Sequence, residues 1–239
     1  MRIVLLTTGG YYGRWVAEGL RERGVPIHAV VLDLHRPKLG VALRKPRRIL
    51  GMGRRWLQAL PMRKFGRMRI SGNLNRPRGI RLLRSLDADV IVLGGARILS
   101  AESLETARHG VLNAHPARVP QFRGTGVVGW SILRGVAVEA VVHYAVPDVD
   151  AGPVVYRELV PVEPGDSLDD IEAHAIRMCT SALADVVARV WRGEELTPEQ
   201  SEPSTEVFSW LNAAERARCD ELIAAGEAVR LYREAAGVG

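Results

Sequence analysis

Short apolar runs alternate with segments of helical periodicity along the first part of this chain. Val4 to Leu6 and Ile27 to Leu32 have the length and composition of buried strands. Between them, apolar and small residues recur at helical spacing, at Trp15, Val16, Gly19 and Leu20. A strand, a helix and a second strand in this order predict an α/β fold, with a Rossmann-like, mostly parallel sheet flanked by helices.

The same pattern predicts the later elements. We expect a turn over residues 7–13, strands at 90–93, 111–113, 138–146 and 154–162, and helices at 79–86, 101–108, 127–134 and 167–191. Ser100 and Ser167 are suited to cap the helices that follow them, because each is followed by acidic residues in the first turn. A linker is predicted at 198–203 and a helical segment at 213–236. The chain thus divides into a domain over 1–197 and a helical C-terminal extension over 198–239.

Charge is unevenly distributed. Residues 36–84 hold 16 Arg and Lys and no Asp or Glu, whereas the rest of the chain holds 17 basic and 27 acidic residues. The alternative is a solvated basic face. The chain has 30 Arg and only 3 Lys, and this bias explains why the basic residues are Arg, but it does not explain the absence of acidic residues over 49 positions. We therefore favour an anionic partner for this insert-like stretch, which its glycines and prolines predict to form short helices and loops.

Other features narrow the class of protein. Cys179 and Cys219 are too few for a disulfide framework. Met1 leads directly into a strand, and no apolar run reaches the roughly 20 residues that cross a bilayer, so a cytoplasmic protein without membrane contact is expected. The histidines lack metal-binding spacing, so no metal is expected.

Asn113, His115 and Asp150 are the candidate catalytic residues. The first two lie in Asn113-Ala114-His115-Pro116, and the third in Asp150-Ala151-Gly152-Pro153. Two positions apart on an extended segment, Asn113 and His115 point the same way. An amide that donates to an oxyanion, an imidazole that takes a proton and a carboxylate that orients the imidazole together suit acyl transfer to an amine.

This run of residues resembles the active site of the 10-formyltetrahydrofolate-dependent formyltransferases, which act on sugars, methionyl-tRNA and glycinamide ribotide. Order and spacing match the family over about 45 residues, at Asn113, His115, Pro116, Pro120, Arg123, Gly124, Trp130, Ile132, Gly135, His143, Asp150, Gly152 and Pro153. The chain departs from the family at Ala117, where a Ser is usual, and near Val141, where a Ser or Thr often faces the site. Both departures remove hydroxyl groups but spare the three catalytic positions.

The resemblance implies a formyl donor, 10-formyltetrahydrofolate, and residues that hold it. Gly94 to Leu99 is similar to the family's pterin-binding segment. The implied cofactor-binding residues are Arg97, Ile98, Leu99, Ala145, Val146 and Val149. The implied acceptor-binding residues are Gly9, Gly10, Tyr11, Tyr12, Arg123 and Gly124. For the glycine turn, a tight connection without ligand is an equal alternative, and His143 is expected to be mainly structural.

The acceptor is less defined than the donor. The basic stretch favours an anionic small-molecule amine, phosphorylated or nucleotide-linked, because Arg binds phosphate through two parallel hydrogen bonds. The alternative is a nucleic-acid-binding protein, tRNA included, built on a formyltransferase-like core. Trp56 and Phe65 are the only aromatic residues within the stretch, so platforms for base stacking are few and nucleic acid is the second choice.

Overall fold

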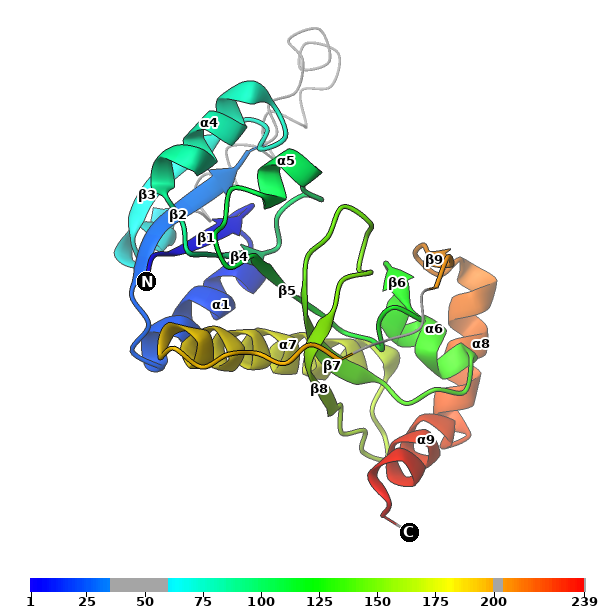
Figure 1. Cartoon of the computed structure of the whole chain (residues 1–239). Coiled ribbons are helices and arrows are strands. Elements are labelled where there is room, and N and C mark those ends of the chain that lie inside the picture. Colours follow the sequence, from blue (N-terminus) through cyan, green and yellow to red (C-terminus); the bar gives the residue numbers. More distant parts are fainter. Residues whose placement is uncertain (35–59, 200–203, 239) are drawn as a thin grey trace, which may run out of the picture. The chain divides into compact units, whose positions relative to one another are not determined.

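The structure is a computed structural model that describes residues 1–34, 60–199 and 204–238 (Figure 1). Its contacts divide the chain into two compact units. Unit 1 comprises Met1–Asn113 and Val187–Glu194, and unit 2 comprises Ala114–Val186 and Glu195–Gly239. The boundary therefore falls within the strand that carries Asn113 and His115.

Parallel strands form the core of unit 1. Its strands are β1 (Ile3–Thr7), β2 (Ile27–Asp33), β3 (Arg67–Ser71), β4 (Val90–Gly94) and most of β5 (Val111–His115). Strand hydrogen bonding follows the order β3-β2-β1-β4-β5-β7-β8, in which β7 (Glu139–Tyr144) pairs antiparallel with β8 (Val154–Leu159). Every residue of β1 and β4 is buried, as expected for central strands of a parallel sheet. The predicted α/β, mostly parallel sheet is confirmed.

Helices flank these strands. Unit 1 holds α1 (Tyr11–Glu22), the 3₁₀ helix η1 (Leu60–Lys64), α4 (Pro77–Leu86) and α5 (Ala101–Leu104) (Figure 1). Gly13 lets α1 approach the sheet, because a Cβ there would collide with the Thr7 side chain and the Gly94 carbonyl. The start of α4 follows from Pro77, whose fixed φ suits the first helical turn.

Three predictions in unit 1 are wrong in detail. The turn after β1 is shorter than 7–13, since α1 already begins at Tyr11 with Gly10 as its N-cap. The basic stretch contains β3, a strand that its exposed residues disguise because it lies at the sheet edge. Helix α5 ends at Leu104 instead of continuing to residue 108, and Thr106 Oγ1 there donates to the Ser103 carbonyl.

Unit 2 contains an antiparallel pair of strands and the helices of the C-terminal extension. Its elements are β6 (Arg123–Gly124), α6 (Val127–Leu133), β7 (Glu139–Tyr144), β8 (Val154–Leu159), β9 (Val207–Phe208), α8 (Ala213–Ala224), α9 (Glu227–Ala236) and the first part of α7 (Leu168–Trp191). Strands β7 and β8 are shorter than the predicted 138–146 and 154–162. Between them, Gly152 packs so closely on the chain that a Cβ would collide with the Tyr144 carbonyl oxygen. A glycine is therefore required in Asp150-Ala151-Gly152.

The C-terminal extension differs from the expected single helical segment. Gly226 adopts φ +82° and separates α8 from α9, a conformation that favours glycine. Strand β9, which precedes them, pairs in parallel with β6. Of the predicted linker, Glu199 forms a bridge with Val154 in β8, and residues 200–203 lie outside the described part of the chain.

Candidate functional site

Strand β5 carries two of the three candidate catalytic residues. Asn113 and His115 occupy alternate positions on it, so both side chains leave the same face of the strand. The His115 side chain is buried, and Asn113 is partly buried. The strand extends to His115, two residues beyond its predicted end, which places the histidine at the carboxyl end of a parallel strand, where α/β folds build their sites.

Two acceptors surround the His115 ring in unit 2. Nε2 lies 2.8 Å from the carbonyl oxygen of Phe122, and Nδ1 lies 3.4 Å from Oδ2 of Asp150. Because a carbonyl can only accept, Nε2 must carry a proton. Nδ1 is therefore the nitrogen left to accept a proton, and it faces the Asp150 carboxylate.

Asp150 adopts an unusual backbone conformation. Its φ is +46°, in the left-handed region that non-glycine residues rarely occupy. Such a conformation persists where surrounding contacts impose it, often at functional sites. Here the backbone amide of Gly124 donates to Oδ2 of Asp150 at 3.1 Å, and Oδ1 lies 3.6 Å from Nε2 of His143. The carboxylate is thus placed between two histidines and one amide.

His143, on β7, is deeply buried beside this pair. Burial lowers the pKa of His143 below its ordinary value of 6.5, and the charge of His115 lowers it further, while Asp150 opposes both effects. The neutral ring donates from Nδ1 to the Tyr144 carbonyl at 3.0 Å. A neutral His143 leaves His115 as the ring that the Asp150 charge can polarise.

Arg123 links the loop that follows β5 to two other segments. Its side chain is buried, and it donates from Nε to the Val149 carbonyl and from Nη1 to the Ser204 carbonyl, both at 2.5 Å. Gly124, next to it, has φ +102°, and a Cβ there would collide with the Phe208 carbonyl. These contacts brace the backbone beside Asp150. The acceptor-binding role implied for Arg123 and Gly124 stays a prediction.

The two departures from the family motif have a common explanation in packing. Ala117 is buried with Phe122, Val127 and Phe208 in one apolar cluster. Val141 is buried with Val119 and Val154 in another. A hydroxyl at either position would need a hydrogen-bond partner inside an apolar core. The contacts that the site loses there are replaced by core packing in unit 2.

The glycine turn of unit 1 is anchored to the end of β4. Thr8 donates to the Gly95 carbonyl from its amide at 3.1 Å and from its hydroxyl at 3.0 Å. Gly10 leads into α1, where Tyr11 is 61% exposed and contacts Trp15 edge to face. Gly9, Gly10, Tyr11 and Tyr12 thus form a fixed turn and the first turn of a helix, and their predicted contact with an acceptor is untested.

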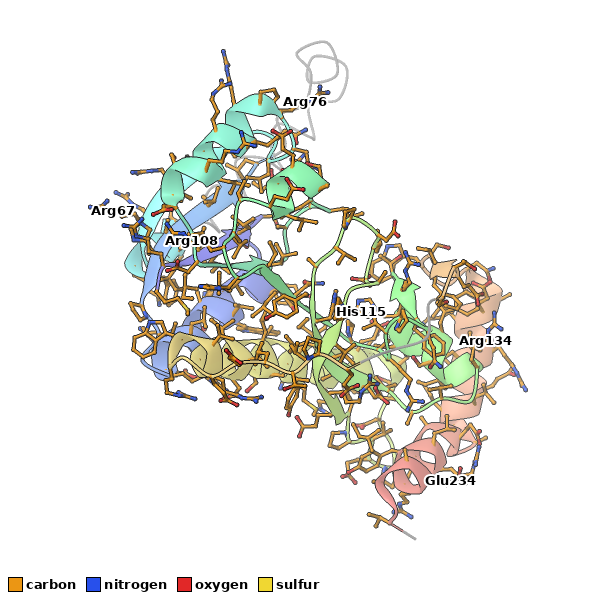
Figure 2. All side chains as sticks on the ribbon, viewed as in Figure 1. Arg67, Arg76, Arg108, His115, Arg134 and Glu234 are labelled. Atoms are coloured by element: carbon orange, nitrogen blue, oxygen red, sulfur yellow. The ribbon has the colours of Figure 1, made fainter. Side chains whose placement is uncertain are left out.

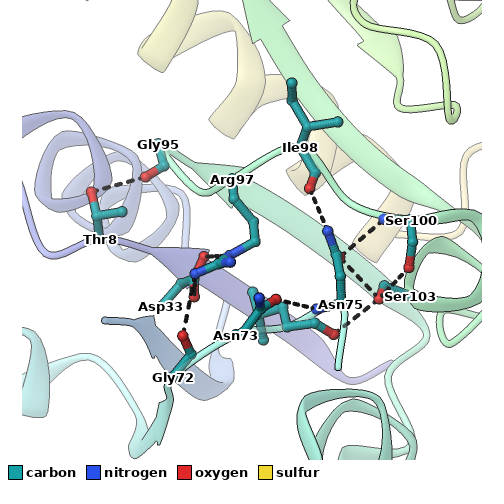
Figure 3. A network of polar contacts seen from close by, with 11 residues as sticks. Thr8, Asp33, Gly72, Asn73, Asn75, Gly95, Arg97, Ile98, Ser100 and Ser103 are labelled. Carbon is teal, nitrogen blue, oxygen red and sulfur yellow. Dashed lines mark hydrogen bonds and ion pairs between the residues drawn. The ribbon is translucent and has the colours of Figure 1, made fainter. Parts of the chain in front are cut away.

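The segment that resembles the pterin-binding run is held by a polar network (Figure 3). Arg97 pairs through two nitrogens with Asp33, the buried carboxylate at the end of β2. Asn75 donates to the Ile98 carbonyl at 2.9 Å and accepts from the Ser100 amide at 3.0 Å. The Ile98 side chain remains 62% exposed, whereas Leu99 is buried. Sequence reasoning missed Asp33 and Asn75, although an acidic residue at the end of an apolar strand was a visible signal.

The second predicted cofactor segment follows β7 in unit 2. Ala145, Val146 and Val149 are partly exposed and lie outside the β7–β8 ladder. The Val149 carbonyl accepts from Arg123, which holds the segment at one end. Irregular backbone at a strand end can present amide and carbonyl groups to a planar heterocycle.

The described part of the basic stretch presents its cations on the surface. Its basic residues are all exposed: Arg63, Lys64, Arg67, Arg69, Arg76, Arg78, Arg81 and Arg84. Figure 2 shows Arg67 and Arg76 projecting from unit 1. Glu18 and Glu102, from elsewhere in the unit, each pair with one of these cations. Residues 36–59, half of the predicted anion-binding stretch, lie outside the described residues.

Two properties of the described residues bear on membrane and metal binding. None of the helices there is both long and apolar enough to pass through a bilayer. In the same ranges, His, Cys, Asp and Glu side chains form no cluster of three or more that could hold a metal ion.

The fold and the residues of β5, β6 and the Asp150 turn define the class of protein. The formyl transferase family model matches residues 41–187, more than half of the chain, so the chain belongs to this family. Among curated relatives, a methionyl-tRNA formyltransferase of Chloroflexus aggregans is 32% identical over 135 residues, 55% of this chain and 44% of that protein. The chain spans about two fifths of the length of the first curated relatives it matches.

Solved structures share the fold. A glycinamide ribonucleotide transformylase from Symbiobacterium toebii superposes with a TM-score of 0.59 at 21% identity, over 81% of this chain and 88% of that one. A sugar N-formyltransferase from a Shewanella species superposes with a TM-score of 0.60 at 15% identity, over 94% of this chain and 88% of that one. At such identities the likeness concerns the fold.

Proposed function

We propose that this chain transfers a formyl group from 10-formyltetrahydrofolate to the amine of an acceptor, a phosphorylated or nucleotide-linked small molecule. The observation that carries the proposal is the His115–Asp150 pair, braced by the Phe122 carbonyl and the Gly124 amide, in a member of the formyl transferase family. The family relationship supports formyl transfer, and the geometry supports the residue roles that we propose.

His115 takes up the proton that the acceptor amine loses. Nε2 is engaged by Phe122, so the proton arrives at Nδ1, where Oδ2 of Asp150 lies 3.4 Å away. This separation slightly exceeds that of an ordinary hydrogen bond, so the ring and the carboxylate can approach each other more closely during the reaction. Asp150 stabilises the charged ring by its own charge.

Asn113 stabilises the negative charge that develops on the formyl oxygen. Its position on the same face of β5 as His115 directs an amide donor toward the reacting group. Loss of one such donor typically lowers the rate by about 10²–10³-fold.

The residues present fit the formyl donor. 10-Formyltetrahydrofolate supplies an activated formyl group when bound. In unit 1, Asn75 holds the backbone at Ile98 and Asp33 holds the Arg97 side chain, and in unit 2 residues 145–149 are partly or fully exposed. Either segment offers amide and carbonyl groups that can bind the edge of a pterin ring. Hydrogen exchange tests this assignment. A bound reduced folate should slow amide exchange in residues 94–99 and 144–150. Slowed exchange that is confined to other parts of the chain contradicts the assignment.

Substitution of the three catalytic residues tests the proposal. Asn113→Ala, His115→Ala and Asp150→Ala should each stay folded by circular dichroism and lose most formyl transfer. The assay uses 10-formyltetrahydrofolate with three acceptors in turn: methionyl-tRNA, glycinamide ribotide and a panel of nucleotide-linked aminosugars. His109→Ala, an exposed histidine of unit 1, is the matched control. Near-wild-type kcat in any two of the three variants means that the assignment is wrong.

A nucleic-acid-binding role is the second candidate. The exposed cations of residues 60–84 favour it, because neutralised phosphates dominate such binding. Copurified material with the absorbance ratio of nucleic acid, released by salt, supports this role. Formyl transfer to a small amine in its absence supports the enzyme.

A further inference from the structure

A cavity of about 160 Å³ opens beside the candidate catalytic histidine, entirely within unit 2. His115 and Pro116 line one part of it, Glu172 and Ile176 of α7 line another, and Trp210 of the C-terminal extension lines a third. Complete ligand sites commonly occupy about 300–1,000 Å³. A cavity of this size therefore suits one ring of a larger acceptor.

Trp210 is held in place although its side chain is 72% exposed. The Ser209 carbonyl, one residue before it, accepts from Nε1 of Trp130 at 2.8 Å. Gly126 packs on the same backbone, since a Cβ at Gly126 would lie 3.2 Å from Cα of Trp210. A fixed backbone and an exposed indole beside a catalytic group are properties of a recognition residue, because an exposed ring offers area at little cost in conformational entropy.

The charge of the cavity selects among acceptor groups. Glu172 is the carboxylate in the cavity lining, and no Arg or Lys from the described residues lines the cavity. Burial raises the pKa of Glu172, with Arg216 opposing and Asp169 adding to the effect. A phosphate in this cavity would lie near a carboxylate, and no cation of the cavity lining would neutralise its charge. The cavity therefore favours hydroxyl and amine groups over phosphate.

We infer that this cavity binds a sugar ring of the acceptor, with the ring face on the Trp210 indole and ring hydroxyls donating to Glu172. The inference rests on the proposed function and narrows its acceptor to an amine carried on or beside a sugar ring. The phosphate or nucleotide of such an acceptor lies outside the cavity. The C-terminal extension thereby supplies part of the acceptor site, next to His115.

Binding and kinetics of Trp210 variants test the inference. The probes are the nucleotide-linked aminosugars. Methionyl-tRNA is the comparison acceptor, because its amine is on an amino acid and not on a sugar ring. Trp210→Ala should raise the Kd and KM of a bound aminosugar about tenfold, the loss of one stacking contact. Its kcat should change less than the KM, and the KM for 10-formyltetrahydrofolate should stay constant. Trp210→Phe should recover part of the affinity, and Glu172→Gln should weaken the same probe.

Val207→Ala is the matched control, since Val207 is also exposed on the extension but does not line the cavity. Calorimetry measures binding without turnover, so the inference is tested even where transfer fails. Absence of binding by every aminosugar overturns it, and so does an unchanged Kd in both Trp210→Ala and Glu172→Gln. If the wild-type protein formylates an acceptor, and Trp210→Ala and Glu172→Gln have the same KM for that acceptor as the wild type, the inference fails and the proposed function stands. If aminosugars bind at Trp210 without any formyl transfer, the proposed function fails instead.

Discussion

The backbone amide of Gly124 donates to the carboxylate of Asp150 across 26 residues of chain, at 3.1 Å. On one side of this bond, Phe122 accepts from the ring of His115, and on the other, Arg123 donates to Val149, the residue before Asp150. Three consecutive residues of one loop therefore set the positions of both members of the histidine–carboxylate pair. Under the proposed function, these residues would orient the pair through geometry, whether or not they also contact the acceptor.

Replacement of Arg123 should lower kcat more than it lowers stability. In Arg123→Lys, an ammonium cannot reproduce the two directed bonds to Val149 and Ser204, and a displacement of about 1 Å at a catalytic pair costs roughly 10²-fold in rate. We expect kcat to fall about 10- to 100-fold with a modest change in acceptor KM. The pH profile of kcat should shift, because Asp150 no longer holds its place beside His115.

Arg134→Lys serves as the control, since Arg134 is exposed and pairs with Glu206 on the surface. Its kcat should match that of the wild type. A fall in kcat of Arg123→Lys that only tracks the unfolded fraction, measured by thermal denaturation, would assign Arg123 a purely structural role.

The buried His143 should make the protein less stable in acid. Its pKa is lowered in the folded state, chiefly by burial, so near and below pH 6.5 the unfolded chain binds a proton that the folded chain does not. Stability is therefore full above this range and declines as pH falls toward the folded pKa. In His143→Gln, the free energy of unfolding in urea should depend less steeply on pH between about 7 and 5. His109→Gln is the control. If the free energy of unfolding of His143→Gln depends on pH as steeply as that of the wild type and of His109→Gln, the prediction is wrong.

Both cysteines should resist thiol reagents in the folded protein. Burial raises the pKa of Cys179 to about 12 and that of Cys219 to about 11, so little thiolate forms near neutral pH. Native protein at pH 8 should not react with an aromatic disulfide reagent within minutes, and protein unfolded in urea should release the full count of two thiols. Rapid labelling of one native thiol would show that its segment opens.

The salt dependence of acceptor binding should distinguish a small phosphorylated amine from RNA. An acceptor with one or two phosphates loses modest affinity between about 50 and 200 mM salt, whereas 6–10 phosphate contacts lose about 10³–10⁵-fold. Paired reversals in the basic stretch should raise acceptor KM, both Arg47→Glu with Arg48→Glu and Arg78→Glu with Arg81→Glu. The control pair is Arg192→Glu with Arg233→Glu, exposed arginines elsewhere. An acceptor KM that is indifferent to salt and to both reversals separates the stretch from the acceptor site.

The sequence determined the elements whose signal is local. The runs that form β1, β2 and β4 are apolar enough for their own residues to predict burial, and the Ser167 hydroxyl accepts from the Asp170 amide, three residues away, at the start of α7. The motif also predicted His115 and Asp150 as catalytic residues, and the structure brings their side chains together in unit 2. These features depend on residue type and spacing, which a single chain displays directly.

Tertiary structure decided what depends on distant partners. Strand β3 forms because its backbone pairs with β2, and β9 because its backbone pairs with β6, although neither has an apolar pattern long enough to predict a strand. The position of Trp210 beside His115, 95 residues away in sequence, follows from that second pairing. Backbone hydrogen bonds and close glycine contacts are independent of local periodicity, so only the folded chain shows which loop orients the histidine and which ring lines the cavity next to it.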